Sequence, residues 1–210
     1  MALFDAYIVV DWSAASRPRR GKDSIWWSLV RRIDGKVVMV RRENPSTRHA
    51  ATQDLADQLA ELLADDARIL IGFDFPFGYP DGTAARLDLP GLPWRHMWQD
   101  IADALDDAPD NSNNRIDVAE NLNERLYGDA FPFWGNVREE ERPYLRRRGR
   151  RPHIDDDLAE WRACDTRGKT TSSVWQLAGN GSVGSQVLTG VPRVLQVRTD
   201  PRLAMDSLIW

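Results

Sequence analysis

The first hydrophobic block of the chain covers residues 7–13, where four apolar or aromatic residues run directly into an aspartate (YIVVDWS). Four such residues in succession, two of them valines, predict a strand that is covered on both faces, as central parallel strands are in α/β sheets. Residues 68–74 (RILIGFD) repeat this construction before a loop that is rich in Pro and Gly. The two blocks therefore predict two strands whose carboxyl ends carry Asp11 and Asp74, where ligands bind in such sheets.

Residues 25–32 and 36–42 are two further strand-like runs, separated by a segment that contains Asp34 and Gly35. An Asp-Gly pair between apolar runs is a strong hairpin signal, so the first three predicted strands form an antiparallel meander. Leucines at helical spacing then predict a helix over residues 48–64. Because a strand reached through a helix usually lies parallel to an earlier neighbour, the order β-β-β-α-β predicts an α/β fold with a mixed sheet.

The rest of the chain predicts loops and helices. Residues 76–93 are interrupted repeatedly by Pro and Gly and cannot form one regular element. Residues 94–105 and 114–126 read as helices. We expect one domain over residues 1–210, with a helical and loop insertion at about 81–190.

Residues 179–184 (GNGSVG) have the glycine spacing of dinucleotide-binding loops, and Asp200 follows near the expected distance. However, Gly190 and Pro192 are expected to cut the helix after this motif short, leaving a short helix over residues 191–198. Too few residues follow to build the second half of a dinucleotide-binding domain. The favoured interpretation of these glycines is close helix packing or a tight approach of the backbone.

The composition, 42% hydrophobic and 29% charged residues in a chain of 210, is that of a soluble globular protein. A formal net charge of −4 gives no overall basic surface, so any contact with nucleic acid has to come from a local patch. Cys164 is the only cysteine, which excludes an intrachain disulfide and a cysteine-clustered zinc site. The N-terminal residues lack the pattern of a signal peptide, and a cytoplasmic protein without membrane spans is expected.

Asp11 and Asp74 are the candidate catalytic and metal-binding residues. If their strands are neighbours, about 4.8 Å apart, the two carboxylates can share one or two divalent cations. Oxygen ligands favour Mg²⁺ or Mn²⁺ over zinc. Asp117 and Glu120, on the predicted helix 114–126, are candidates for a further ligand, although acids on a helix surface usually face water.

Candidate phosphate-binding groups follow both acids. Loop 12–24 carries four cations, Arg19 and Lys22 among them; such a run is usually a solvated connection, but here it can also hold a phosphate close to the acids. Arg86 in the later loop offers forked donors for a phosphate, or it caps a helix or pairs with Asp88. The candidate substrate-binding residues are Ser13, Arg19, Lys22 and Arg86.

The sharpest charge feature covers residues 139–152 (EEERPYLRRRGRRP), where three acids precede a block rich in arginine. Such a block is either a flexible solvated loop or a surface that binds polyanions by releasing counterions. Arginine in place of lysine, with Tyr144 and Trp134 available for stacking, favours a polyanion such as nucleic acid.

Several segments together resemble a bacterial family of unknown function that is assigned to the ribonuclease H-like superfamily and is predicted to contain nucleases. These segments cover nearly the whole chain and read DWSAAS, FDFPFGYP followed by Arg86, NRIDVAENLN, FWG and SSVWQLAGNGSVGSQ. The resemblance implies a five-stranded mixed sheet of order 3-2-1-4-5 with helices on both faces, and it maps metal-binding acids onto Asp11 and Asp74. Members of the family continue with a final strand and helix; an apolar run begins at residues 207–210, so we expect this chain to lack that last part.

Three classes of function remain open. The leading expectation is metal-dependent phosphodiester hydrolysis with Mg²⁺ or Mn²⁺. A phosphotransferase of the actin or sugar-kinase type shares the sheet, but the first loop lacks a glycine-rich phosphate hairpin. The third class is a non-catalytic module that binds nucleic acid or nucleotides. Ser13 lies in no nucleophile elbow and Cys164 has no identifiable base, which gives nucleophilic hydrolysis little support.

Overall fold

The computed structural model describes residues 3–137, 140–168 and 171–205. Contacts divide the chain into two compact units. The first unit consists of residues 1–74, 107–113 and 193–210, and the second consists of residues 75–106 and 114–192. The predicted insertion at about 81–190 thus belongs to the second unit, apart from the segment 107–113.

The first unit is built on a four-stranded mixed sheet in the order β3-β2-β1-β4. Its strands are β1 (Ala6–Asp11), β2 (Trp26–Ile33), β3 (Lys36–Glu43) and β4 (Ile69–Phe73). β1 pairs antiparallel with β2 and parallel with β4, which confirms the predicted meander, the parallel return and the α/β class. The apolar run at residues 207–210, where a further element was expected, lies outside the described residues.

The hairpin between β2 and β3 forms at the predicted Asp-Gly pair. Asp34 and Gly35 both have positive φ, 49° and 76°. Two central residues with positive φ twist the chain in the sense that two antiparallel strands require, which is why Asp-Gly is favoured at such turns.

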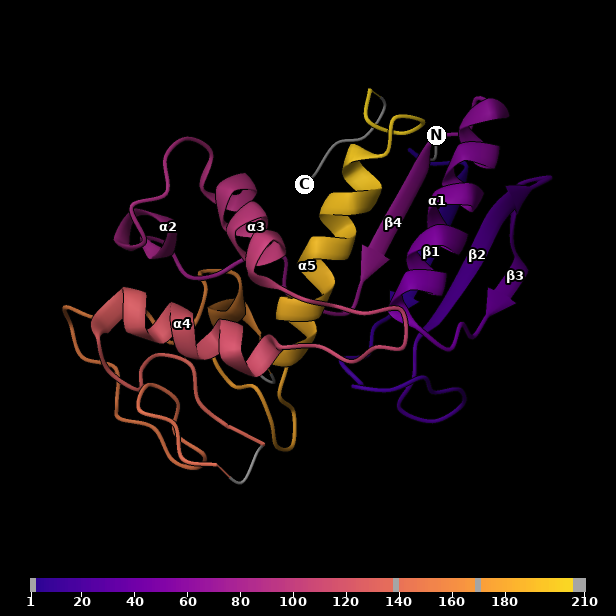
Figure 1. Cartoon of the computed structure of the whole chain (residues 1–210). Helices are drawn as coiled ribbons and strands as arrows, with labels where there is room; N and C mark the ends of the chain where they lie inside the picture. The colour runs from indigo at the N-terminus through magenta and orange to yellow at the C-terminus, as the bar shows by residue number, and fades with distance from the viewer. Residues whose placement is uncertain (1–2, 138–139, 169–170, 206–210) are drawn as a thin grey trace. The chain divides into compact units, whose positions relative to one another are not determined.

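Helix α1 (Arg48–Ala64) covers one face of the sheet, as Figure 1 shows. Thr47 caps it by accepting a hydrogen bond from the Ala50 amide at 3.2 Å. Its leucines pack over the inward residues of the strands, and each such burial contributes about 1.5–3 kcal/mol. The buried side chains of this layer include Leu55, Leu59, Leu62, Ile8, Val10, Trp27 and Leu29.

The other face of the sheet is open within the described residues. Val9 is 60% exposed, Met39 59% and Leu70 39%. The strand pairing places these three side chains on the same face, opposite Ile8 and Val10. The prediction that residues 7–10 form a strand covered on both faces is therefore wrong. A run of apolar residues fits the pleat of a strand on either face, but it does not determine which neighbours cover it.

The other helices are α2 (Thr83–Arg86), α3 (Pro93–Ala104) and α4 (Arg115–Tyr127), all in the second unit, and α5 (Gly184–Thr199), which begins there and ends in the first. The prediction of a short helix over 191–198 is wrong, because α5 runs through both Gly190 and Pro192. A Cβ at Gly190 would lie 2.3 Å from Cζ of Phe75, so the glycine allows close packing and does not end the helix.

Candidate metal-binding site

The strand register brings the two predicted acids to the same edge of the sheet. β1 and β4 run parallel, and Val10 pairs with Phe73, the residues just before Asp11 and Asp74. The Asp74 amide continues this ladder by donating to the Val10 carbonyl at 3.1 Å. The predicted juxtaposition of Asp11 and Asp74 at the carboxyl ends of neighbouring strands is confirmed.

The electrostatics of this pair favour an added positive charge. Partial enclosure of its carboxyl raises the pKa of Asp74 to about 6, and the charge of Asp11 and a hydrogen bond between the two carboxyl groups add to this rise, against the Trp12 amide. That amide donates to Oδ1 of Asp74 at 2.8 Å and fixes the carboxyl in place. Both acids remain exposed to solvent as residues. A neutral Asp74 carboxyl that donates to the Asp11 carboxylate can exchange its proton for a cation.

The donor set fits a hard divalent cation that keeps several of its waters. In the described part of the chain, no group of three or more His, Cys, Asp or Glu side chains is arranged to hold a metal. Mg²⁺ is commonly held by one or two carboxylates, with water and substrate phosphate completing its shell. A cation held by Asp11 and Asp74 would have to complete its shell with water or substrate oxygen atoms.

Asp117 and Glu120 lie on α4 in the second unit, where both carboxylates bind Arg142. The Arg142 guanidinium donates to Oδ1 of Asp117 at 2.6 Å and to Oε2 of Glu120 at 2.5 Å. Arg142 is only 11% exposed at its side chain. These ion pairs give both acids a structural task, and a role as a metal ligand stays a prediction.

Loop 12–24 is fixed to the first unit by side chains at its far end. Asn44 accepts from the Gly21 amide at 2.7 Å and donates to Oγ of Ser24 and to the Ile25 carbonyl. The Ser13 hydroxyl spans the loop by donating to the Asp23 carbonyl at 3.2 Å. The loop is thus an ordered structure with its backbone held at several points.

The cationic side chains of this loop differ in whether they already form an ion pair. Arg19 lies 3.5 Å from the Asp23 carboxylate in an exposed ion pair, which is worth little in water. Arg17, Arg20 and Lys22 are exposed, and within the described residues they form no ion pair. These three side chains are available to an anionic ligand of the first unit.

Arg86 ends α2 in the second unit, and its guanidinium lies over the ring of Tyr127 at 4.1 Å. The residue is exposed, so the stacked guanidinium keeps donors that can reach a ligand. Among the described residues Arg86 forms no ion pair with Asp88, which was one of the alternatives, and makes this ring contact. Its role in substrate binding stays a prediction.

The glycine motif has the packing role that the sequence favoured. A Cβ at Gly184, the first residue of α5, would lie 2.6 Å from the Val174 carbonyl oxygen and 2.7 Å from that of Gln176. Gly179 and Gly181 have φ of 104° and 74°, which L side chains rarely adopt. Close approach of the backbone therefore explains Gly184, and the left-handed backbone conformation explains Gly179 and Gly181.

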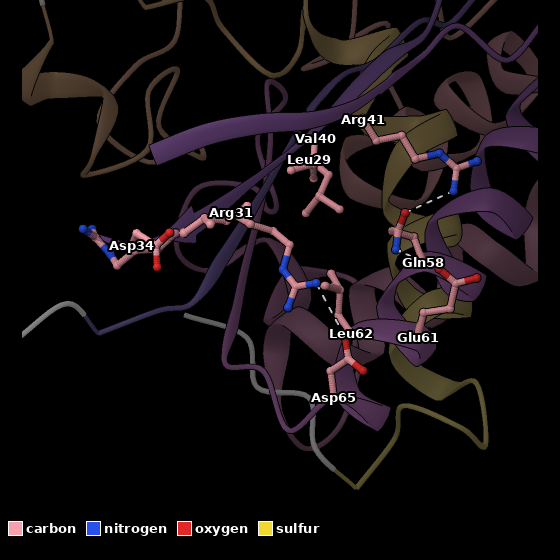
Figure 2. Close-up of a pocket in the computed structure, with 11 residues that line it drawn as sticks. Leu29, Arg31, Asp34, Val40, Arg41, Gln58, Glu61, Leu62 and Asp65 are labelled. Atoms are coloured by element: carbon pink, nitrogen blue, oxygen red, sulfur yellow. Dashed lines mark hydrogen bonds and ion pairs between the residues drawn. The ribbon is translucent and has the colours of Figure 1, made fainter. Parts of the chain in front are cut away.

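A shallow depression of about 630 Å³ lies elsewhere in the first unit, between the β2–β3 hairpin and α1. Figure 2 shows Arg41 directed toward Gln58 and Arg31 directed toward Asp65, whereas Asp34 lies apart from both pairs. Arg31 lies 3.5 Å from the Asp65 carboxylate, and Arg41 donates to Gln58 at 3.1 Å. Because these groups already bind each other, the depression offers little chemistry to a ligand.

Buried polar residues of the first unit that sequence reasoning missed include Arg48, Asn111 and, at its side chain, Asp107. Arg48 begins α1, and the other two lie in the connection between α3 and α4. Nothing in the pattern distinguishes them from surface residues, because their burial arises from contacts about sixty positions apart in the chain.

Within the described residues, no helix combines the length and the apolar character needed to cross a membrane. Comparison with models of protein families, with curated proteins and with solved structures gave no match.

Proposed function

We propose that the first unit binds Mg²⁺ or Mn²⁺ between Asp11 and Asp74 and hydrolyses phosphodiesters, as a nuclease of the ribonuclease H-like type. The observation that carries this proposal is the hydrogen-bonded pair of carboxyl groups at the ends of two parallel strands, with the pKa of Asp74 raised to about 6. Two acids placed in this way repel each other when both are ionised, and a divalent cation removes that repulsion.

The fold supports this reading. The order β3-β2-β1-β4 reproduces the first four positions of the 3-2-1-4-5 sheet that the resemblance implies, with acids at the ends of its first and fourth strands. Membership of the superfamily and a cytoplasmic location are parts of the proposal.

Each group has a distinct task in the proposed reaction. A bound cation would lower the pKa of a water and stabilise charge on the leaving oxygen. The Trp12 amide holds the Asp74 carboxyl in one orientation, so that the pair is arranged before the cation arrives. Arg17, Arg20 and Lys22 attract the phosphate, and Ser13 stiffens the loop that carries them.

Asp11→Asn tests the proposal because it keeps the shape of the side chain and removes a charged ligand. Cleavage of a fluorescent oligonucleotide with Mn²⁺ should fall by about a hundredfold or more, since even groups that only support a metal ligand contribute about 10–100-fold. The matched control is Asp34→Asn, the same change in the β2–β3 turn, where Asn keeps the positive φ. Equal cleavage by parent and Asp11→Asn would remove the proposal.

A second candidate function, which needs no catalysis, is nucleic-acid binding by the second unit. Arg146, Arg147 and Arg148 are exposed, and they form no ion pair within the described residues, whereas Arg150 and Arg151 pair with Glu160 and Asp157. Adjacent arginines with free forked donors match the spacing and charge of a phosphate backbone.

The base of this arginine loop is anchored. The Arg146 carbonyl accepts from the amides of Gly135 and Asn136 at 2.9 and 3.1 Å, and Leu145 is buried. On the far side, Gly149 turns the chain with a φ of 71°. The three free guanidinium groups therefore extend from a fixed segment, which reduces the entropy lost when they bind an anion.

A further inference from the structure

A buried polar cluster centred on Asp107 lies in the first unit. The Asp107 carboxylate accepts from Nε of Arg48 at 3.0 Å and from Nη2 of Arg193 at 2.7 Å. Arg48 is 0% exposed, and the side chains of Asp107 and Arg193 are 4% and 10% exposed. Two guanidinium groups thus share one carboxylate away from water.

The two arginines of this cluster have different further contacts. Arg48 uses its remaining donors on backbone carbonyls: Nη1 donates to Ala15 at 2.8 Å and to Ser13 at 3.3 Å, and Nη2 donates to Asn111 at 2.8 Å. Arg193 instead donates to Gln196, one turn further along α5. Of the two, Arg48 is the one that reaches the loop after Asp11.

Asn111 connects the same loop to the cluster. Its side-chain oxygen accepts from the Arg48 amide at 2.8 Å, and its Nδ2 donates to the carbonyls of Arg17 and Ser46 at 3.2 and 3.3 Å. Loop 12–24 is therefore held at three carbonyls in its first half, those of Ser13, Ala15 and Arg17.

Burial of this excess positive charge is costly, and well-packed apolar side chains of similar volume often give equal or greater stability. What apolar residues cannot supply is a set of directed donors that holds the carbonyls of an irregular loop. Without Arg48, the carbonyls of Ser13 and Ala15 would lose these hydrogen-bond donors next to the buried start of α1.

We infer that Arg48 is a positioning residue, held by Asp107, that fixes loop 12–24 and so directs its free cations to the phosphate of the substrate. Only the second part of this inference, that the cations are directed to a phosphate, rests on the proposed function. The fixing of the loop is a property of the folded protein whether or not it cleaves a phosphodiester.

The test compares Arg48→Lys with Arg193→Lys. Both changes keep the charge next to Asp107, but only the first removes donors from the loop. Asn111→Gly is a milder variant, because Gly accepts the φ of 71° at this position and the Arg48–Asp107 pair is retained. The readouts are limited trypsin cleavage after Arg19, Arg20 and Lys22, followed by mass spectrometry, and KM and kcat for the oligonucleotide with Mn²⁺.

Arg48→Lys should speed trypsin cleavage in the loop, relative to cleavage after Arg147, by about tenfold, the effect of losing one charge-assisted hydrogen bond. Asn111→Gly loses neutral hydrogen bonds to the Arg17 and Ser46 carbonyls and should speed the same cleavage by about threefold. KM should rise by a similar factor with less change in kcat and in Mn²⁺ affinity. Arg193→Lys should leave both readouts close to those of the parent.

Equal trypsin rates in Arg48→Lys, Asn111→Gly and the parent would overturn the inference, as would an equal increase in Arg193→Lys. A loop that loosens while KM stays constant would also overturn it, because the positioning of the cations would then have no consequence. If the parent itself shows no turnover, the proposed function fails, and the trypsin comparison still decides whether Arg48 fixes the loop.

Discussion

The ionisation of Asp74 depends on the fold. Enclosure of its carboxyl, the charge of Asp11 and the hydrogen bond between the two acids raise its pKa from 3.8 to about 6. A raised pKa in the folded state means that the neutral form stabilises the protein. This contribution is fully present below about pH 4 and is lost as the pH rises through about 6.

Asp74→Asn should therefore remove one part of the pH dependence of stability. Without metal, the free energy of unfolding of the variant relative to that of the parent should increase as the pH rises from about 4 to about 7, because Asn cannot ionise. Urea denaturation at several pH values measures this difference. Parallel profiles for the two proteins would show that the fold does not raise the pKa of Asp74.

The residues of the site show what a sequence can and cannot reveal. Asp11 and Asp74 were found because each follows an apolar run, and parallel strands bring their carboxyl ends to one edge. Arg48 was read as the first residue of a helix, since its partner Asp107 is 59 positions away and Arg193 is 86 positions from the same carboxylate. Contacts of that separation leave no periodicity in the chain.

At the scale of elements, local signals predicted the hairpin, α1 and the four strands, because turn chemistry and leucine spacing act over a few residues. The same local reading failed for α5. Glycine and proline usually end helices, but here Gly190 fits against Phe75 and Pro192 is tolerated inside the helix. The helix continues through Gly190 because it packs closely against Phe75, and the local sequence pattern does not indicate that contact.

The arginine loop gives a prediction at this scale. Replacing Arg146, Arg147 and Arg148 by Gln should weaken binding to an oligonucleotide and flatten its salt dependence by about 2–3 in the slope of log K against log salt concentration. Fluorescence anisotropy at several salt concentrations measures this slope. Arg125→Gln, an arginine of the same unit that pairs with Asp100 at 2.9 Å, serves as the control.

The arginine triple variant and Asp11→Asn should affect binding and cleavage of the oligonucleotide differently. The arginine triple variant should lose affinity while its Mn²⁺ binding stays unchanged, and Asp11→Asn should lose cleavage while it still binds the oligonucleotide. An unchanged salt slope in the triple variant would show that the loop is a solvated surface, as charge runs usually are.

At the scale of the whole molecule, the first unit holds the acid pair, its ordered cationic loop and the Asp107 cluster, and the second holds the arginine loop and the ring contact of Arg86. The open face of the sheet, with Val9, Met39 and Leu70 exposed, departs from the expectation of a strand covered on both faces. The acid pair lies at the ends of β1 and β4.

The central claim is that a divalent cation binds between Asp11 and Asp74. The most direct test is anomalous diffraction from crystals soaked in Mn²⁺ above about pH 6, the raised pKa of Asp74, where its carboxyl is ionised. We expect an anomalous peak in contact with both carboxylates, and no peak there in crystals of Asp11→Asn. The account would be contradicted if crystals of the parent showed no Mn²⁺ at this position and the two carboxyl groups were still hydrogen-bonded to each other.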